Sequence, residues 1–311
     1  MCLSWRSLLL GLGLLVLAGA HTQAAVVIVI VSSERSTAYV EAAEALVGEL
    51  ERGGLSRYDM LQLTAAELAG TGPLTPKLFV ALGSEATGLL AKTETRTPVL
   101  STLLPRSSFE RVLRETGRKS SAQFSALYLD QPLSRQLDLI RLALPEAHRI
   151  GVLWGPESQS QALALKSQAR ARGFDLLEGA VGGGESLFPV LKRILEDADL
   201  LLAVADPQVF NSASIQNILL SSFGAKVPLV AFSPAYVRAG ALLAVHVTPS
   251  QMGRQAATIA EGVLRGKALS ATPLYSQEFN VAVNEHVARS LGLTLDAQSL
   301  RERLRQREGA P

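Results

Sequence analysis

The sequence predicts an α/β protein built as two doubly wound α/β lobes with an interlobe cleft. Short apolar runs rich in β-branched residues alternate with longer stretches of helical periodicity along the chain. The run at 26–31 is continuously apolar, which is typical of a strand in a parallel sheet covered on both faces. The same order of elements restarts at 149, so the second half repeats the architecture of the first.

The first half begins with the strand at 26–31 and a helix over 36–54, which a Gly-Gly pair ends. Further strands are predicted at 78–82 and 98–102, and a helix begins near Ser107.

The pattern of the second half predicts more strands than that of the first. They lie at 149–154, 174–181, 199–205, 227–232 and 241–247. Helices are expected between them, over 156–173, 185–198 and 212–225. After the last of these strands come a helix over 250–268, an extended segment over 273–284, a short helix and a charged helical end.

The first 24 residues predict a cleavable signal peptide. One positive charge precedes an apolar run of about fourteen residues, and small residues follow, with cleavage after Ala24 or Ala20. The run is short for a membrane span of about twenty residues, although a retained anchor is the alternative. Cys2 is the only cysteine, so the mature chain has no thiol for a disulfide or a Cys-based metal site. We therefore expect a periplasmic protein that is stabilised by its hydrophobic core alone, without disulfides.

Charge and motifs exclude several function classes. The net charge of +2 comes from nearly balanced acids and bases, which argues against a nucleic-acid surface. The sequence has no nucleophile elbow, paired-His zinc motif or phosphate-binding loop. His148, His246 and His286 lie far apart on different elements, where structural or solvated roles are favoured. We expect no enzyme activity, no metal and no cofactor.

Polar and aromatic residues follow the carboxyl ends of the predicted strands, where ligands of open α/β sheets bind. Two such edges that face each other would form a cleft that closes on a small molecule. The candidate ligand-binding residues are Ser33, Ser84, Thr102, Trp154, Asp206, Ser233 and Tyr236. Each has a structural alternative, because serines at these places cap helices and Trp154 can serve packing alone. Asp206, followed by Pro207, is either a ligand hook or a cap at the start of the next helix.

Motifs in the second half resemble a known family. In order they are "LPEAHRIGVLWGPES", "ADPQVFNSASIQNILL", "VPLVAFSPAYVRAGALLAV", "MGRQAATIAEGVLRGKA" and "FNVAVNEHVARSLGLTL". They are similar to the ABC transporter substrate-binding family, in the branch that includes periplasmic binders of aromatic amino acids. The resemblance covers the mature chain and is clearest from about Ala126 onward.

The resemblance implies a type I periplasmic-binding fold, with interlobe crossings near 126–129, 245–248 and 280–284. The first lobe would then comprise 25–127 with 249–279, and the second 128–248 with 280–311. Two features depart from the family pattern. The cysteine of exported lipoproteins is absent, and "SSERSTAY" in the first-lobe rim does not match an aromatic amino-acid pocket.

The leading hypothesis is a periplasmic substrate-binding component of an ABC-type importer. It would act as a monomer, capture a small metabolite between its lobes, with amino-acid-like compounds as one candidate class, and deliver it to a membrane permease. The alternative is a sensory or accessory binding protein that signals to a membrane partner.

Overall fold

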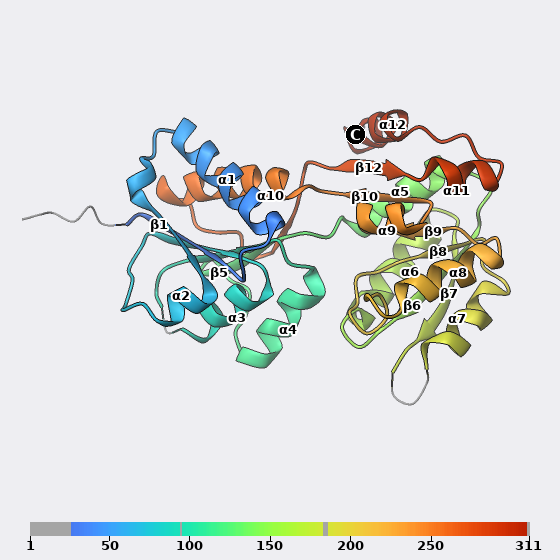
Figure 1. Cartoon of the computed structure of the whole chain (residues 1–311), viewed down its shortest axis with the longest axis horizontal. Coiled ribbons are helices and arrows are strands. Elements are labelled where there is room, and N and C mark those ends of the chain that lie inside the picture. The colour runs from blue at the N-terminus through green and yellow to red at the C-terminus, as the bar shows by residue number, and fades with distance from the viewer. Residues whose placement is uncertain (1–25, 94, 183–185, 310–311) are drawn as a thin grey trace, which may run out of the picture.

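The computed structural model describes residues 26–93, 95–182 and 186–309. The predicted signal peptide lies outside these residues. Two α/β lobes lie side by side along the long axis of the molecule, and extended segments connect them (Figure 1). Each lobe is built on its own six-stranded sheet, and this arrangement confirms the predicted fold class.

The first sheet has the order β11-β5-β4-β3-β1-β2, and all its pairs are parallel. Its strands are β1 (Ile28–Ser32), β2 (Met60–Thr64), β3 (Leu78–Leu82), β4 (Val99–Thr102), β5 (Phe124–Tyr128) and β11 (Leu274–Tyr275). The helices of this lobe are α1 (Thr37–Arg52), α2 (Ala65–Ala69), α3 (Ser84–Lys92), α4 (Arg106–Thr116) and α10 (Pro249–Leu264).

The second sheet has the order β12-β10-β9-β8-β6-β7, with an antiparallel edge pair. Its strands are β6 (Arg149–Trp154), β7 (Asp175–Ala180), β8 (Leu200–Leu202), β9 (Leu229–Ala231), β10 (Leu243–His246) and β12 (Asn280–Val283). The helices are α5 (Leu133–Ala143), α6 (Ala162–Ala171), α7 (Leu187–Leu195), α8 (Ile215–Gly224), α9 (Pro234–Ala239), α11 (Glu285–Ser290) and α12 (Ala297–Gly309). Short 3₁₀ turns lie at Arg57–Asp59 and Gln159–Gln161.

The alternation of side chains along β1 explains why its apolar run is unbroken. Ile28 and Ile30 pack into one cluster with α1 and α10, while Val29 and Val31 pack into another with α3 and α4. Successive side chains of a strand point to opposite faces, and here both faces are covered. All four side chains are at most 1% exposed, as expected for a parallel sheet between two helix layers.

The chain passes between the two sheets at 129–132, 247–248 and 276–279. The third crossing therefore comes earlier than expected, and its placement at 280–284 was wrong. Residues Asn280–Val283 form β12, which pairs with β10 from Leu243↔Val283 to His246↔Asn280. The extended sequence over 273–284 hides this, because two short edge strands of different sheets follow each other with only four residues between them. The residue boundaries of the lobes stay a prediction.

Candidate functional site

A cavity of about 430 Å³ lies between the two lobes. Its walls come from the segments that follow the carboxyl ends of strands in both sheets, which is where an open α/β sheet binds ligands. The volume falls in the range of small-molecule sites. The lining residues are Glu34, Ser36, Ala38, Tyr39, Leu103, Pro105, Leu129, Asp130, Ala205, Phe232, Ser233, Pro234, His246, Val247 and Pro249.

The charged residues that line this cavity are all acidic, and the nearest cation that acts on them, Arg106, is paired with Glu110 at 2.6 Å. Asp130 and Glu34 supply two carboxyl groups, and none of the lining residues is Lys or Arg. Asp130 lies in the crossing after β5, and one of its oxygens accepts the backbone N–H of Arg106 at the start of α4. Burial raises the pKa of Asp130 to about 6. At neutral pH Asp130 therefore carries a negative charge that is poorly solvated, and a cation in the cavity would stabilise it.

Aromatic and hydroxyl groups complete the walls. Burial raises the pKa of Tyr39, so its hydroxyl stays protonated, and the Ser33 hydroxyl forms a hydrogen bond with it. The Tyr39 hydroxyl lies tightly against Gly83 (φ 92), where a Cβ would be 2.3 Å from the phenolic oxygen. On the second lobe, the Phe232 ring packs edge-on against Tyr236, with centroids 5.1 Å apart. The cavity thus joins an acidic group to hydroxyl donors and an apolar wall.

His246 adds an unpaired polar atom. Burial lowers its pKa, so the imidazole is neutral at pH 7. Its Nδ1 is buried and has no hydrogen-bond partner among the described residues. The backbone of Ala244 also acts on this imidazole, so His246 contributes a neutral and largely enclosed ring to the cavity wall.

The backbone is strained at one point of the cavity wall. Leu103 has a φ of 54°, in the left-handed region that a bulky L-residue seldom occupies. The hydrogen bonds of its neighbours hold it there: Gly83 N–H donates to Thr102 O at 2.8 Å, and Leu129 N–H donates to Leu104 O at 3.1 Å. Strain of this kind costs about 1–3 kcal/mol and clusters at ligand sites.

Of the residues predicted in the first lobe, none lines this cavity. The Ser33 hydroxyl accepts the N–H groups of Glu85 and Ala86 at 3.1 Å each, and so caps α3. Ser84 begins α3 and lines a separate hollow among α2, α3 and α4. Thr102 is 0% exposed, and its hydroxyl has no partner among the described residues.

In the second lobe, Trp154 and Asp206 are both enclosed. Trp154 is 2% exposed in the core, and its indole N–H donates to Glu178 Oε1 at 3.0 Å. Asp206 is also 2% exposed, and both of its oxygens accept backbone N–H groups. The carboxylate therefore caps backbone amides of the neighbouring loops and is not a free acceptor for a ligand.

Ser233 is the one predicted residue that lines the cavity. Its hydroxyl also caps α9 by accepting the Tyr236 N–H at 3.4 Å. Tyr236 lies behind Phe232 and supports that ring. The structure thus brings together Ser233 with four residues that the sequence pattern does not predict as ligand-binding: Tyr39, Asp130, Phe232 and His246.

Comparison with known proteins places the chain in a family. The model of the family described as "ABC transporter substrate binding protein" matches residues 75–304, well over half of the chain. The chain belongs to this family. The resemblance found in the sequence motifs is thereby confirmed.

This substrate-binding protein has one curated relative to compare, a tyrosine-binding protein of Clostridioides difficile. The two are 22% identical over 165 residues, which are 52% of this chain and 47% of the relative. The chain thus matches about half the length of that protein.

Solved structures of the same fold match a larger share of this chain than the curated relative does. A ligand-free, open structure of a substrate-binding protein with adhesive properties from Clostridium difficile has a TM-score of 0.68 at 19% identity, covering 87% of this chain and 96% of that one. A conserved domain protein from Vibrio cholerae has a TM-score of 0.63 at 19% identity, with 89% and 97% covered. An ABC domain in complex with L-Trp from Streptococcus pneumonia has a TM-score of 0.60 at 17% identity, with 88% and 97% covered. These likenesses confirm the fold.

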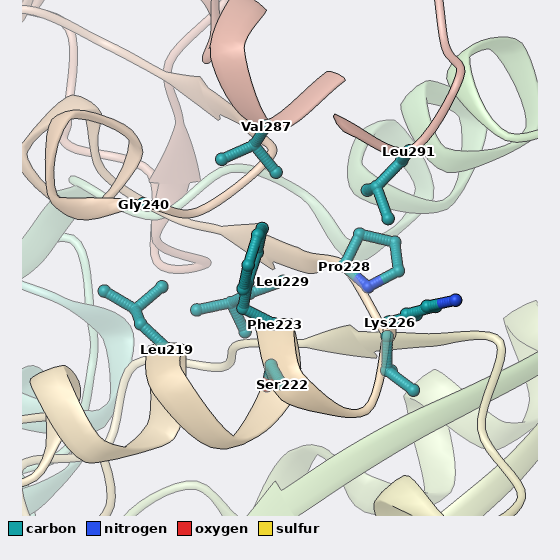
Figure 2. Close-up of a pocket in the computed structure, with 10 residues that line it drawn as sticks. Leu219, Ser222, Phe223, Lys226, Pro228, Leu229, Gly240, Val287 and Leu291 are labelled. Atoms are coloured by element: carbon teal, nitrogen blue, oxygen red, sulfur yellow. The ribbon is translucent and has the colours of Figure 1, made fainter. Parts of the chain in front are cut away.

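Two other hollows of the substrate-binding protein fit a ligand less well. Figure 2 shows one between α8 and α11, lined by side chains such as Leu219, Val287 and Leu291. Its volume of about 10 Å³ is that of a single water probe, so it is a packing gap. A groove of about 1290 Å³ in the first lobe is lined mainly by segments that precede β3 and β4. It lies at the amino edge of that sheet, away from the interlobe cavity.

Within 26–93, 95–182 and 186–309, no cluster of His, Cys, Asp and Glu could hold a metal ion. In the same ranges no helix has the length and apolarity that crossing a bilayer requires.

Proposed function

We propose that this protein is the periplasmic substrate-binding component of an ABC-type importer, and that it captures an amino acid with an aromatic or large apolar side chain. The ligand is bound between the lobes and handed to a membrane permease without bond chemistry, by a protein that acts as a monomer. The observation that carries the ligand class is Asp130, a poorly solvated carboxylate in a cavity whose lining includes no Lys or Arg.

Each part of an amino acid has a counterpart in the cavity. The ammonium group pairs with Asp130, and Glu34 adds a second negative charge nearby. The carboxylate accepts hydrogen bonds from hydroxyls such as those of Tyr39 and Ser233. The side chain packs against the Phe232 ring and the prolines of the wall. Burial of this apolar part supplies affinity, while the polar groups fix its orientation.

The comparisons support the same class. The curated relative is named a tyrosine-binding protein, and one structural neighbour was solved with L-Trp. The predicted signal peptide supports export to the compartment from which an importer takes its substrate.

The test is isothermal titration calorimetry with three ligands that share one ring: L-tyrosine, tyramine and 3-(4-hydroxyphenyl)propionate. The first carries both charged groups, the second only the amine and the third only the carboxylate. We expect L-tyrosine and tyramine to bind, because each brings an ammonium group to Asp130 and Glu34. The propionate should not bind, because its only charged group is a carboxylate and the lining offers no cation to pair with it.

Two outcomes would contradict the proposal. Binding of the propionate as tight as that of tyramine would show that the acidic groups do not select the ligand. The absence of any heat with the three compounds and with the other aromatic and large apolar amino acids would remove the ligand class.

A further inference from the structure

The two lobes contact each other at a second place, apart from the crossings. Two consecutive residues of α4 in the first lobe bond to the segment between β6 and α6 in the second. Arg111 Nη1 lies 2.9 Å from Glu157 Oε1, and the Ser160 hydroxyl donates to Glu110 Oε2 at 3.0 Å. Figure 1 shows α4 at the side of its lobe that faces the second lobe. We name these four residues the interlobe latch.

Asp206 fixes the loop that carries the two latch residues of the second lobe. Its Oδ2 accepts the backbone N–H groups of Glu157 at 3.0 Å and Ser158 at 2.8 Å, and its Oδ1 accepts the Gln208 N–H at 2.9 Å. Gly155 lies so close that a Cβ there would be 2.3 Å from Asp206 Oδ1. The loop that presents Glu157 is therefore fixed by the strand end that carries Asp206.

The ion pair of the latch is partly desolvated. The Glu157 side chain is 12% exposed and that of Arg111 is 38% exposed. The second oxygen of Glu157 is buried and has no partner among the described residues. A carboxylate in this position depends on Arg111, and it would be left unpaired if the lobes moved apart at this point.

We propose that the interlobe latch stabilises the conformation in which the lobes touch, and that Asp206 is a positioning residue for it. This inference rests on the proposed function, because a ligand held between lobes leaves when they separate. Weakening the latch lowers the fraction of molecules in the touching conformation, and the apparent affinity falls by the same factor. Ligand reaches the separated form freely, so the loss lies in the dissociation rate.

The first test needs no ligand, so it can fail independently of the proposed function. Two spin labels are placed at exposed positions on either side of the latch by E115C and L163C, in the chain that begins after the predicted signal peptide and therefore has no native cysteine. Double electron–electron resonance then measures the distance distribution between the lobes. The label sites lie on α4 and α6, next to the two halves of the latch.

The variants are R111E, E157R and the double swap R111E/E157R, with R114E as the matched control. Arg114 is exposed on the same helix and makes no ion pair among the described residues. We expect both single reversals to add longer distances, the swap to restore the parent distribution, and R114E to leave it unchanged. Single reversals without effect, or a swap that fails to restore the short distance, would overturn the latch.

The second test measures the dissociation of L-tyrosine by stopped-flow fluorescence. We expect R111E to raise the dissociation rate about three- to tenfold, which is the range for a pair worth roughly 1 kcal/mol, while the association rate stays within twofold. R114E should match the parent protein. An unchanged dissociation rate in R111E would overturn the role of the latch, even if L-tyrosine binding itself is confirmed.

The positioning role of Asp206 is tested by D206N, with D206A as a second variant. Each should add longer distances in the parent background and add nothing further in R111E, because the latch is already broken there. Equal, additive effects in both backgrounds would contradict a role through the latch.

Discussion

Replacing Asp206 by alanine should destabilise the second lobe more than any other single change at the strand ends. The side chain is 2% exposed, and its two oxygens accept three backbone N–H groups from the loops on either side. Alanine leaves these donors without an acceptor in a place that water reaches poorly.

The magnitude follows from the hydrogen bonds. Each bond to a charged group contributes about 1.5–3 kcal/mol, and the amides of Glu157 and Gln208 can recover part of this from water because they are only partly buried. The Ser158 amide is fully buried. We therefore expect D206A to lower the free energy of unfolding by about 4 kcal/mol, a large part of the 5–15 kcal/mol typical of a folded protein.

The assay is urea unfolding followed by the fluorescence of Trp154, which lies in the core of the same lobe. D175A is the matched control, because Asp175 is exposed at the start of β7 and its loss should change stability by less than about 0.5 kcal/mol. A loss of under 1 kcal/mol in D206A would refute the reasoning that the carboxylate is a structural cap.

Three further changes test other parts of the fold. G253A should cost at least about 2 kcal/mol in urea unfolding, because a Cβ there would lie 2.2 Å from the backbone oxygen of Ala42, and overpacking at this helix contact forces the backbones apart. S33A should cost about 1 kcal/mol, since it removes the acceptor for two N–H groups of α3; full stability in this variant would contradict the cap. The third change concerns pH. Burial raises the pKa of Asp130 to about 6 in the folded protein, so the folded state holds this proton more tightly than the unfolded one. The stabilisation from this tighter proton binding is fully present below pH 4 and is lost as the pH rises through 6. Over this range the free energy of unfolding of the wild type should fall by about 2–3 kcal/mol relative to that of D130N. Parallel pH profiles of the two proteins would contradict this shift.

The sequence was sufficient for the fold class, because continuous apolar runs and helical periodicity depend on local pattern alone. It missed β2, whose residues are only partly buried at a sheet edge, and it misplaced the third crossing at β12. Both are edge strands, which bury fewer side chains and leave a weaker apolar signal. It also missed β5 (Phe124–Tyr128), which is fully buried inside the first sheet, because its last residues run directly into the first crossing and were assigned to it.

The site was harder to predict, because strand ends supply both ligand contacts and caps. Ser33 and Asp206 occupy the expected edge, yet their oxygens are taken by backbone amides that sequence spacing does not reveal. Asp130 was passed over because it lies in a crossing and not at a strand end that leads directly into a helix of its own lobe. The sequence carries one signal for this site: Asp130 is the only acidic residue in the stretch 124–132, which leads out of the first lobe.

The most direct test of the central claim is calorimetric titration of wild type and D130N at pH 7.5 with whichever compound of the tyrosine series binds the wild type most tightly. Asparagine keeps an oxygen for the N–H of Arg106, so α4 stays capped while the charge is lost. Removing one partner of a buried charge pair costs about 2–5 kcal/mol, so D130N should bind at least about 30-fold more weakly. An unchanged affinity would contradict the account, because the ligand would then not meet Asp130.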